Sequence, residues 1–274
     1  MKVIIVGGVA GGATTAARLR RLNEKAEIIL IERGNFISFA NCGLPYYIGD
    51  VIKNKKDLLL QTPESFNRRF NIDVRIKQEV TKIDRKEKCV VIRNLETNEE
   101  YKESYDKLVL SPGAKPINPF KDLNSERIKT LRNVEDSVEI KDYIIKNNVK
   151  KVAIIGGGYI GVEVAENLNN FKDVKVTIIE KSSHLIAPLD EDMARFVHNI
   201  LEKKGINIIL ENKSLDSDYI ILCLGVRPED KLAVEAGLKV YPKGGIEVDD
   251  YMRTNDEAIY ALGDAVKINN ITKK

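Results

Sequence analysis

The stretch that decides the fold is residues 151–180, "KVAIIGGGYIGVEVAENLNNFKDVKVTIIE". An apolar run leads into Gly156, Gly158 and Gly161, then into a helical pattern and a second apolar run that ends at Glu180. This order of strand, glycine turn, helix and strand is typical of a dinucleotide-binding unit, because the helix N-terminus beyond the tight turn can accept a pyrophosphate. We therefore predict a nucleotide site here, with Glu180 on the ribose hydroxyl groups.

The same order occurs at the start of the chain, in "KVIIVGGVAGGATTAARLRRL" followed by "AEIILIE". Gly7 and Gly12 stand at the first and third glycine positions, whereas Val9 stands at the second, where close approach to a phosphate normally requires glycine. Glu32 ends the second strand, where it can accept ribose hydroxyl groups. Two ordinary βαβ turns without a ligand would also explain these motifs, but their joint occurrence favours two nucleotide sites.

The segments around these units predict further strands. Residues 72–76 and 80–92 indicate short strands with a polar turn at 84–88. We interpret "YDKLVLSPGAKP" and "SDYIILCLGVRPE" as buried strands that run into turns and cross between two domains. "AIYALGDAV" predicts a last strand ending at Gly263 and Asp264, where the carboxylate could hold a ribityl hydroxyl or simply close a turn.

The predicted fold class is α/β, with two Rossmann-like dinucleotide-binding domains in a three-layer arrangement of parallel sheet, helices and a β-meander. The first domain is split in sequence around the second. We expect residues 1–115 and 243–274 to form the first domain and residues 116–242 to form the second.

Composition excludes several function classes. The 44 basic residues nearly balance the 41 acidic ones, so a net charge of +3 gives no signal for nucleic acid or a membrane surface. We find no signal peptide and no apolar run near the ~20 residues that cross a bilayer. Cys42, Cys89 and Cys223 form no CxxC pair, which argues against a zinc site or a disulfide framework and fits a reducing cytoplasm. His184 and His198 have no motif around them and are interpreted as surface or packing residues.

Cys42 lies in "SFANCGLPYYIG", just before Pro45, and proline favours the first turn of a helix. A helix beginning here would stabilise a thiolate through its dipole and free N–H groups. The alternative is a buried structural thiol, which is the interpretation that we give to Cys89 and Cys223 in their strand-like runs.

Together these features resemble the FAD/NAD(P)-dependent pyridine nucleotide-disulfide oxidoreductases. "SFANCGLPYYIG" and "GGVAGGATTAARLRRL", with its unusual Val9, resemble the coenzyme A-disulfide reductase branch in particular. The resemblance implies FAD on the first unit, NADH or NADPH on the second, and coenzyme A as substrate or mixed-disulfide partner. Glu180 argues for NADH, since a carboxylate repels a 2′-phosphate, while Lys181 leaves NADPH open.

The resemblance also implies roles for individual residues. Tyr47 stands where the glutathione-reductase type has a second cysteine, so Cys42 is expected to act alone as the catalytic residue, through a mixed disulfide or a sulfenic acid. The cofactor-binding residues that we assign are Gly7, Gly8, Val9, Ala10, Gly11, Gly12, Glu32, Arg33, Val80, Ser111, Gly113, Gly156, Gly158, Tyr159, Ile160, Gly161, Glu163, Glu180, Gly225, Gly263 and Asp264. The substrate-binding residues that we assign are Thr14, Arg18, Arg21, Ser38 and Asn41.

The sequence departs from the family pattern in two places. After "GINIIL", only "ENKSLDS" stands where relatives carry a second meander, and the helix and dimerisation domain of the homodimeric relatives do not follow "GDAVKINNITKK". The leading prediction is an NAD(P)H-dependent flavoprotein that reduces coenzyme A disulfide. The alternatives are an NADH oxidase or peroxidase that uses a Cys42 sulfenic acid, and a non-catalytic nucleotide-binding fragment. The oligomeric state stays open.

Overall fold

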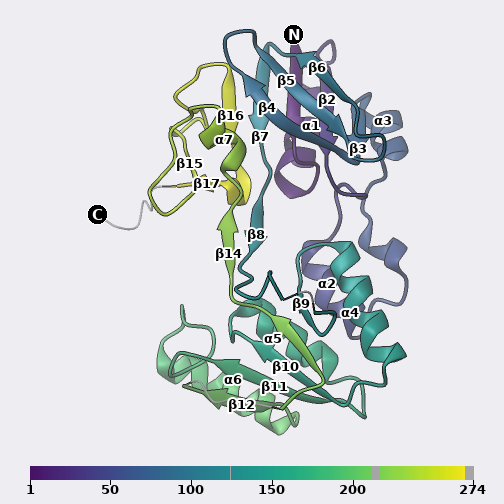
Figure 1. Cartoon of the computed structure of the whole chain (residues 1–274), viewed down its shortest axis with the longest axis vertical. Coiled ribbons are helices and arrows are strands. Elements are labelled where there is room, and N and C mark those ends of the chain that lie inside the picture. The colour runs from purple at the N-terminus through teal and green to yellow at the C-terminus, as the bar shows by residue number, and fades with distance from the viewer. Residues whose placement is uncertain (124, 212–215, 269–274) are drawn as a thin grey trace. The chain divides into compact units, whose positions relative to one another are not determined.

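The structure is a computed structural model that describes residues 1–123, 125–211 and 216–268 (Figure 1). The chain forms two compact units, of which the first comprises Met1–Phe39, Leu59–Lys115 and Arg227–Lys274, and the second comprises Ala40–Leu58 and Pro116–Val226. Residues 212–215 of the segment "ENKSLDS" and residues 269–274 of the return segment lie outside the described residues.

Two segments lie elsewhere than the predicted domain bounds place them. The return to the first unit comes at Arg227 rather than at residue 243, because the helix α7 (Lys231–Glu235) already packs against β4 (Gln78–Asp84) of the first unit. The segment Ala40–Leu58 belongs to the second unit rather than the first, because its helix α2 (Leu44–Ile48) packs against helices of that unit.

The first unit is built on a parallel sheet of five strands in the order β16-β7-β1-β2-β3. These strands are β1 (Lys2–Val6), β2 (Glu27–Glu32), β3 (Asp73–Ile76), β7 (Lys107–Leu110) and β16 (Ile259–Ala261). Alternate strand residues such as Ile5 and Leu30 pack with Ala13 and Ala16 of α1 (Ala10–Leu22) and with Phe66 of α3 (Pro63–Phe70). The small alanines let α1 approach the sheet closely, which positions its N-terminus over the strand ends.

A three-stranded antiparallel meander supplies the third layer of the first unit. It consists of β4, β5 (Cys89–Asn94) and β6 (Glu100–Ser104). Val90 and Ile92 of β5 share one buried cluster with Ile4 and Ile31, which are strand residues of the opposite sheet face. The three-layer prediction is therefore confirmed for this unit, and the predicted polar turn lies between β4 and β5.

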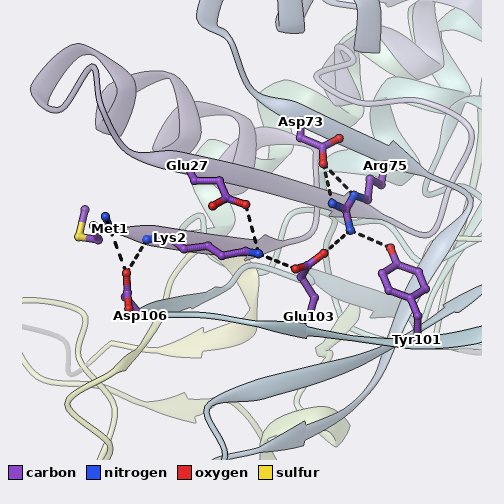
Figure 2. Close-up of polar contacts among 8 residues, drawn as sticks. All are labelled: Met1, Lys2, Glu27, Asp73, Arg75, Tyr101, Glu103 and Asp106. Carbon is purple, nitrogen blue, oxygen red and sulfur yellow. Dashed lines mark hydrogen bonds and ion pairs between the residues drawn. The ribbon is translucent and has the colours of Figure 1, made fainter.

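Ion pairs also join this meander to the parallel sheet (Figure 2). Lys2 Nζ lies 2.5 Å from a Glu103 oxygen and 3.1 Å from a Glu27 oxygen, and Arg75 donates to Glu103 at 2.8 Å and to Asp73 at 2.7 Å. Burial raises the pKa of Glu103, but the hydrogen bonds from Lys2 and Arg75 outweigh it and hold that pKa below its ordinary value. The carboxylate of Glu103 thus joins β6 to β1 and β3.

Short elements complete the first unit and link it to the second. Within the first unit β15 (Ile246–Glu247) pairs with β17 (Val266–Lys267), and the 3-10 helix η3 (Gly263–Ala265) follows β16. The two connecting segments, β8 (Ala114–Pro116) and β14 (Val226–Pro228), pair with each other.

The second unit repeats the parallel sheet, in the order β12-β11-β10-β13-β9. Its strands are β9 (Ile128–Thr130), β10 (Lys151–Ile155), β11 (Lys175–Glu180), β12 (Asn207–Leu210) and β13 (Tyr219–Leu222). Its helices are α4 (Val134–Lys146), α5 (Tyr159–Leu168), α6 (Glu191–Lys203) and α2, with the 3-10 helices η1 (Asn41–Gly43) and η2 (Lys55–Leu58). The described residues of this unit include no meander. None of the helices in the described part of the chain is long and apolar enough to span a membrane.

Candidate functional site

The glycine turn of the first unit connects β1 to α1. Gly7 has a φ of +96°, and a Cβ atom there would lie 2.1 Å from the Ser111 carbonyl oxygen. A Cβ atom at Gly12 would lie 1.7 Å from the carbonyl oxygen of Gly7, so a side chain at this position would prevent α1 from packing as closely against the end of β1 as it does. Val9 caps α1 with no side-chain hydrogen bond, which leaves the first-turn N–H groups available to an anion.

The turn of the second unit is built in the same way, between β10 and α5. Gly156 has a φ of +109°, and a Cβ atom there would lie 2.3 Å from the Cys223 carbonyl oxygen, while one at Gly161 would lie 2.0 Å from Gly156 O. A Cβ atom at Gly158 would meet nothing within 4 Å, so the space beside the start of α5 is open. First and third glycines are therefore required by the fold, whereas Gly158 leaves room for a ligand.

Both strand-end carboxylates accept two backbone hydrogen bonds. Glu32 accepts from the Gly8 and Gly34 amides, each at 2.7 Å, and Glu180 accepts from the Gly157 amide at 2.6 Å and the Ser182 amide at 2.8 Å. Burial raises the pKa of Glu180, but these N–H donors outweigh it and hold the pKa below the ordinary value. Glu180 is therefore a fixed anion beside its glycine turn.

A cavity of about 460 Å³ opens beside the glycine turn of the first unit. Four of the predicted cofactor residues line it, namely Gly7, Glu32, Arg33 and Val80. The volume lies in the range of ~300–1,000 Å³ found for small-molecule sites. Its other wall includes Glu229, Lys231 and Glu235, which sequence reasoning missed because no motif surrounds them.

The remaining predicted cofactor residues of the first unit gather around the same turn. A Cβ atom at Gly11 would lie 2.5 Å from Ser111 Oγ, and one at Gly263 would lie 3.7 Å from that oxygen. Ser38, which is a predicted substrate residue, lies beside them, with a φ of +43° and its amide hydrogen donated to Gly8 O at 2.9 Å. Of the other predicted cofactor residues, Ala10 begins α1, Gly113 has a φ of +74° and Asp264 lies exposed in η3.

Three of the predicted substrate residues lie on α1. Thr14, Arg18 and Arg21 are exposed, which leaves them accessible to a ligand. Arg20, between them, instead donates to the carbonyl oxygens of Phe70 and Asn71, each at 2.7 Å, and so ties α1 to the end of α3.

The cysteine segment lies in the second unit. Cys42 is exposed and stands in η1, directly before α2, whose first turn contains Pro45. The predicted helix start is therefore confirmed, although α2 is only 5 residues long. The side-chain oxygen of Asn41 is buried without a hydrogen-bond partner among the described residues. Asn41 and Cys42 therefore belong to the second unit, whereas Ser38 belongs to the first.

The remaining predicted cofactor residues of the second unit lie at the start of α5 and after β13. Tyr159 and Ile160 are exposed, at 59% and 41%, Glu163 lies one turn further along α5, and Gly225 has a φ of +90°. Tyr159, Ile160 and Glu163 thus follow the open turn directly along α5, as a nucleotide site would require.

The other two cysteines are less accessible than Cys42, since Cys89 is buried and Cys223 is half-buried. Cys89 is buried in β5, and burial raises the pKa of the Cys223 thiol to about 12. His184 and His198 both contact Leu185, through its carbonyl oxygen at 2.8 Å and its amide at 2.9 Å respectively, which supports their interpretation as packing residues. No group of three or more candidate metal ligands occurs within residues 1–123, 125–211 and 216–268.

The two glycine turns and their strand-end glutamates fit two dinucleotides. The cavity with Glu32 can take a nucleoside in the first unit, and the open space at Gly158 with Glu180 can take a second nucleotide. The sequence motifs identified both turns and both carboxylates.

Comparison with known proteins gives a consistent picture. The profile of a family described as "Pyridine nucleotide-disulphide oxidoreductase" matches residues 1–273. A coenzyme A disulfide reductase of Staphylococcus haemolyticus (strain JCSC1435) is 38% identical over 280 residues, covering 97% of this chain and 63% of that protein. The chain thus spans less than two thirds of the length of this relative.

Two solved structures are also similar. That of reduced Bacillus anthracis CoADR-RHD has a TM-score of 0.96 at 44% identity, covering 100% of this chain and 52% of that one. That of a NAD-dependent persulfide reductase from A. fulgidus has a TM-score of 0.92 at 35% identity, covering 97% of this chain and 53% of that one.

Proposed function

Because the chain belongs to the pyridine nucleotide-disulphide oxidoreductase family, we propose that it passes electrons from NADH through FAD to Cys42, which reduces coenzyme A disulfide. The observation that carries this proposal is the accessibility of the thiols. Cys42 is exposed at the start of a helix, while Cys89 is buried and Cys223 is half-buried, with the pKa of its thiol raised by burial. The similarity to coenzyme A disulfide reductases supports the choice of acceptor.

In this proposal the two glycine turns bind different cofactors. The first glycine turn and the cavity with Glu32 hold FAD, and the second turn with Glu180 holds the nicotinamide nucleotide. Bound flavin supplies the two-electron step between nicotinamide and thiol. The fixed charge of Glu180 favours NADH, since it would repel the 2′-phosphate of NADPH.

Cys42 supplies the covalent step. Its thiolate attacks coenzyme A disulfide, so that one sulfur–sulfur bond breaks, a Cys42–coenzyme A mixed disulfide forms and one coenzyme A thiolate leaves. Two electrons from NADH then cleave the mixed disulfide, which releases the second coenzyme A thiolate and restores Cys42. The sum consumes NADH, one proton and one disulfide, and gives NAD⁺ and two thiols. Arg18 and Arg21 would bind the phosphates of the substrate.

The test is an anaerobic titration of the flavin-loaded chain with NADH, followed by addition of coenzyme A disulfide. We expect bleaching of the flavin absorption, a long-wavelength charge-transfer band from the Cys42 thiolate, and reoxidation by the disulfide. Cys42→Ser should lose the band and the turnover, whereas the matched variant Cys89→Ala should keep both. Disulfide reduction that survives in Cys42→Ser would refute the mechanism.

The persulfide reductase similarity motivates a second acceptor for the same thiol. The same titration, finished with a persulfide, oxygen or peroxide, separates these acceptors from coenzyme A disulfide. A chain that takes up no flavin would instead be a non-catalytic nucleotide-binding protein.

A further inference from the structure

The guanidinium group of Arg33 lies between two carboxylates at the wall of the cavity in the first unit. Its nitrogens are 3.8 Å from a Glu79 oxygen and 3.7 Å from a Glu229 oxygen, and all three residues line the cavity. Because the Arg33 side chain is 54% exposed, little else in its surroundings fixes its position. The two carboxylates therefore set where the guanidinium stands.

Glu229 is the more firmly anchored of these two acids. Its side chain is 16% exposed, compared with 39% for Glu79, and its carboxylate also lies 3.5 Å from Lys115 Nζ. Its backbone amide donates to Gly113 O at 2.9 Å. Glu229 is thus held by the backbone and by a second cation, so it can orient Arg33 rather than follow it.

The cavity is suited to an uncharged nucleoside rather than to a phosphate. Glu32, Glu79, Glu229 and Glu235 line it together with Arg33, Arg93 and Lys231, so the carboxylates slightly outnumber the cations and the lining as a whole does not favour an anion. The anion-binding position of this unit is instead the uncapped start of α1. A planar guanidinium held at the wall offers a face on which a purine can stack.

We propose that Glu229 is a positioning residue for the adenosine end of FAD, which acts by holding the Arg33 guanidinium against the purine. This inference rests on the proposed function, because it assumes that FAD is the ligand of the first unit. Glu229 lies far from Arg33 in the sequence and reaches it only after the chain has returned from the second unit.

The test is a double-mutant cycle on FAD affinity. The purified holoprotein is stripped of FAD, and the dissociation constant for FAD is measured by quenching of flavin fluorescence in wild type, Glu229→Gln, Arg33→Met and the double variant. Glu229→Gln should weaken FAD binding about three- to tenfold, as expected for a part-buried charge pair. In the Arg33→Met background the same change should have almost no further effect, which a merely structural role would not produce.

Glu96→Gln is the matched control, since Glu96 is an acid of the same unit that pairs with Lys77 at 2.6 Å and lies outside the cavity. Its FAD affinity should equal that of wild type, and thermal melting of each stripped variant checks the fold. The inference fails if Glu229→Gln binds FAD like wild type, or loses as much affinity in the Arg33→Met background as when Arg33 is present. A wild-type chain that binds no FAD would overturn the proposed function, and this inference with it.

Discussion

The two units share one construction at their glycine turns and differ in what covers their sheets. In each unit the first glycine has a positive φ, the third packs on the first, and a glutamate at the strand end accepts two amide hydrogens. The similarity extends to the other end of the first strand. The Lys2 amide donates to Asp106 at 2.6 Å, and the Lys151 amide donates to Asp218 at 2.8 Å.

The covering layers differ. In the first unit the meander buries Ile4 and Ile31 to 0% and 1% exposure, and it carries Glu103 into a network with Lys2 and Arg75 (Figure 2). In the second unit Lys151 pairs with Asp216, whose side chain is 89% exposed. The second unit instead includes the segment Ala40–Leu58, which contains Cys42. The glycine turn is thus the feature that both units share, while the surrounding layers distinguish the unit with the cavity from the unit that carries Cys42.

The largest effect should come from the first glycine of either turn. Gly156→Ala places a Cβ atom 2.3 Å from a backbone carbonyl oxygen at a φ of +109°, so we expect the free energy of unfolding to fall by about 3 kcal/mol or more. Gly7→Ala should cost as much, because its Cβ atom would lie 2.1 Å from Ser111 O. Chemical denaturation measures both.

Gly158→Ala is the matched control, since a Cβ atom there meets nothing within 4 Å. Its unfolding free energy should stay within about 1 kcal/mol of wild type while NADH binding weakens. If Gly158→Ala destabilised the fold as strongly as Gly156→Ala, the distinction between fold glycines and ligand glycines would be wrong.

The second prediction concerns the covering layers. Glu103→Gln leaves Lys2 and Arg75 without their shared carboxylate, so we expect a loss of about 2 kcal/mol in unfolding free energy. Asp216→Asn should change it by less than about 0.5 kcal/mol, because that ion pair is exposed. Equal losses would show that the meander network adds nothing beyond a surface ion pair.

The pH dependence of stability checks the same point. The folded-state pKa of Glu103 lies below its ordinary value of 4.5, so the stabilisation from its charge is complete above that value. It is lost as the pH falls through the lower, folded-state pKa. Wild type should therefore lose more stability than Glu103→Gln on acidification from about pH 5, as measured by urea unfolding.

The third prediction removes each of the two strand-end carboxylates in turn. Glu180→Ala should raise the KM for NADH about tenfold and reduce the preference over NADPH, because the proposed acceptor for the ribose hydroxyl groups and a charge that repels a 2′-phosphate are removed. Glu32→Ala should weaken FAD retention without changing the nucleotide preference. Steady-state kinetics and flavin content measure these effects. A change of nucleotide preference in Glu32→Ala would reverse the assignment of the units.

Sequence predicted what is encoded locally. Both glycine turns, both terminal glutamates and the helix start at Pro45 depend on neighbours within a few residues, and the structure has them. The sequence did not reveal β6, whose pattern "EYKES" is polar and which becomes a strand only by pairing with β5. Nor did it place Glu229 at the cavity or α2 in the second unit, because both depend on packing between segments far apart in the chain.

The smallest effect concerns how the Cys42 segment is held in the second unit. Asp50, just after α2, contacts Lys53 at 2.6 Å and Lys141 of α4 at 2.9 Å, and these two lysines, Lys53 first, hold its pKa below the ordinary value. The side chains differ in burial, since Lys53 is 69% exposed and Lys141 only 11%. Lys141 Nζ also stands 4.3 Å from the ring centroid of Tyr47.

We therefore expect Lys141→Met to lower the unfolding free energy by about 1 kcal/mol and Lys53→Met by less than about 0.3 kcal/mol, although both remove one positive charge beside the same carboxylate. The cation over Tyr47 joins α4 to α2, so its loss should also speed alkylation of Cys42 by iodoacetamide about twofold. Equal effects of the two variants would mean that the charge of Asp50, and not the contact with Tyr47, fixes the segment. In that case the second unit would hold its thiol by surface electrostatics alone, and raising the salt concentration should loosen it in wild type as well.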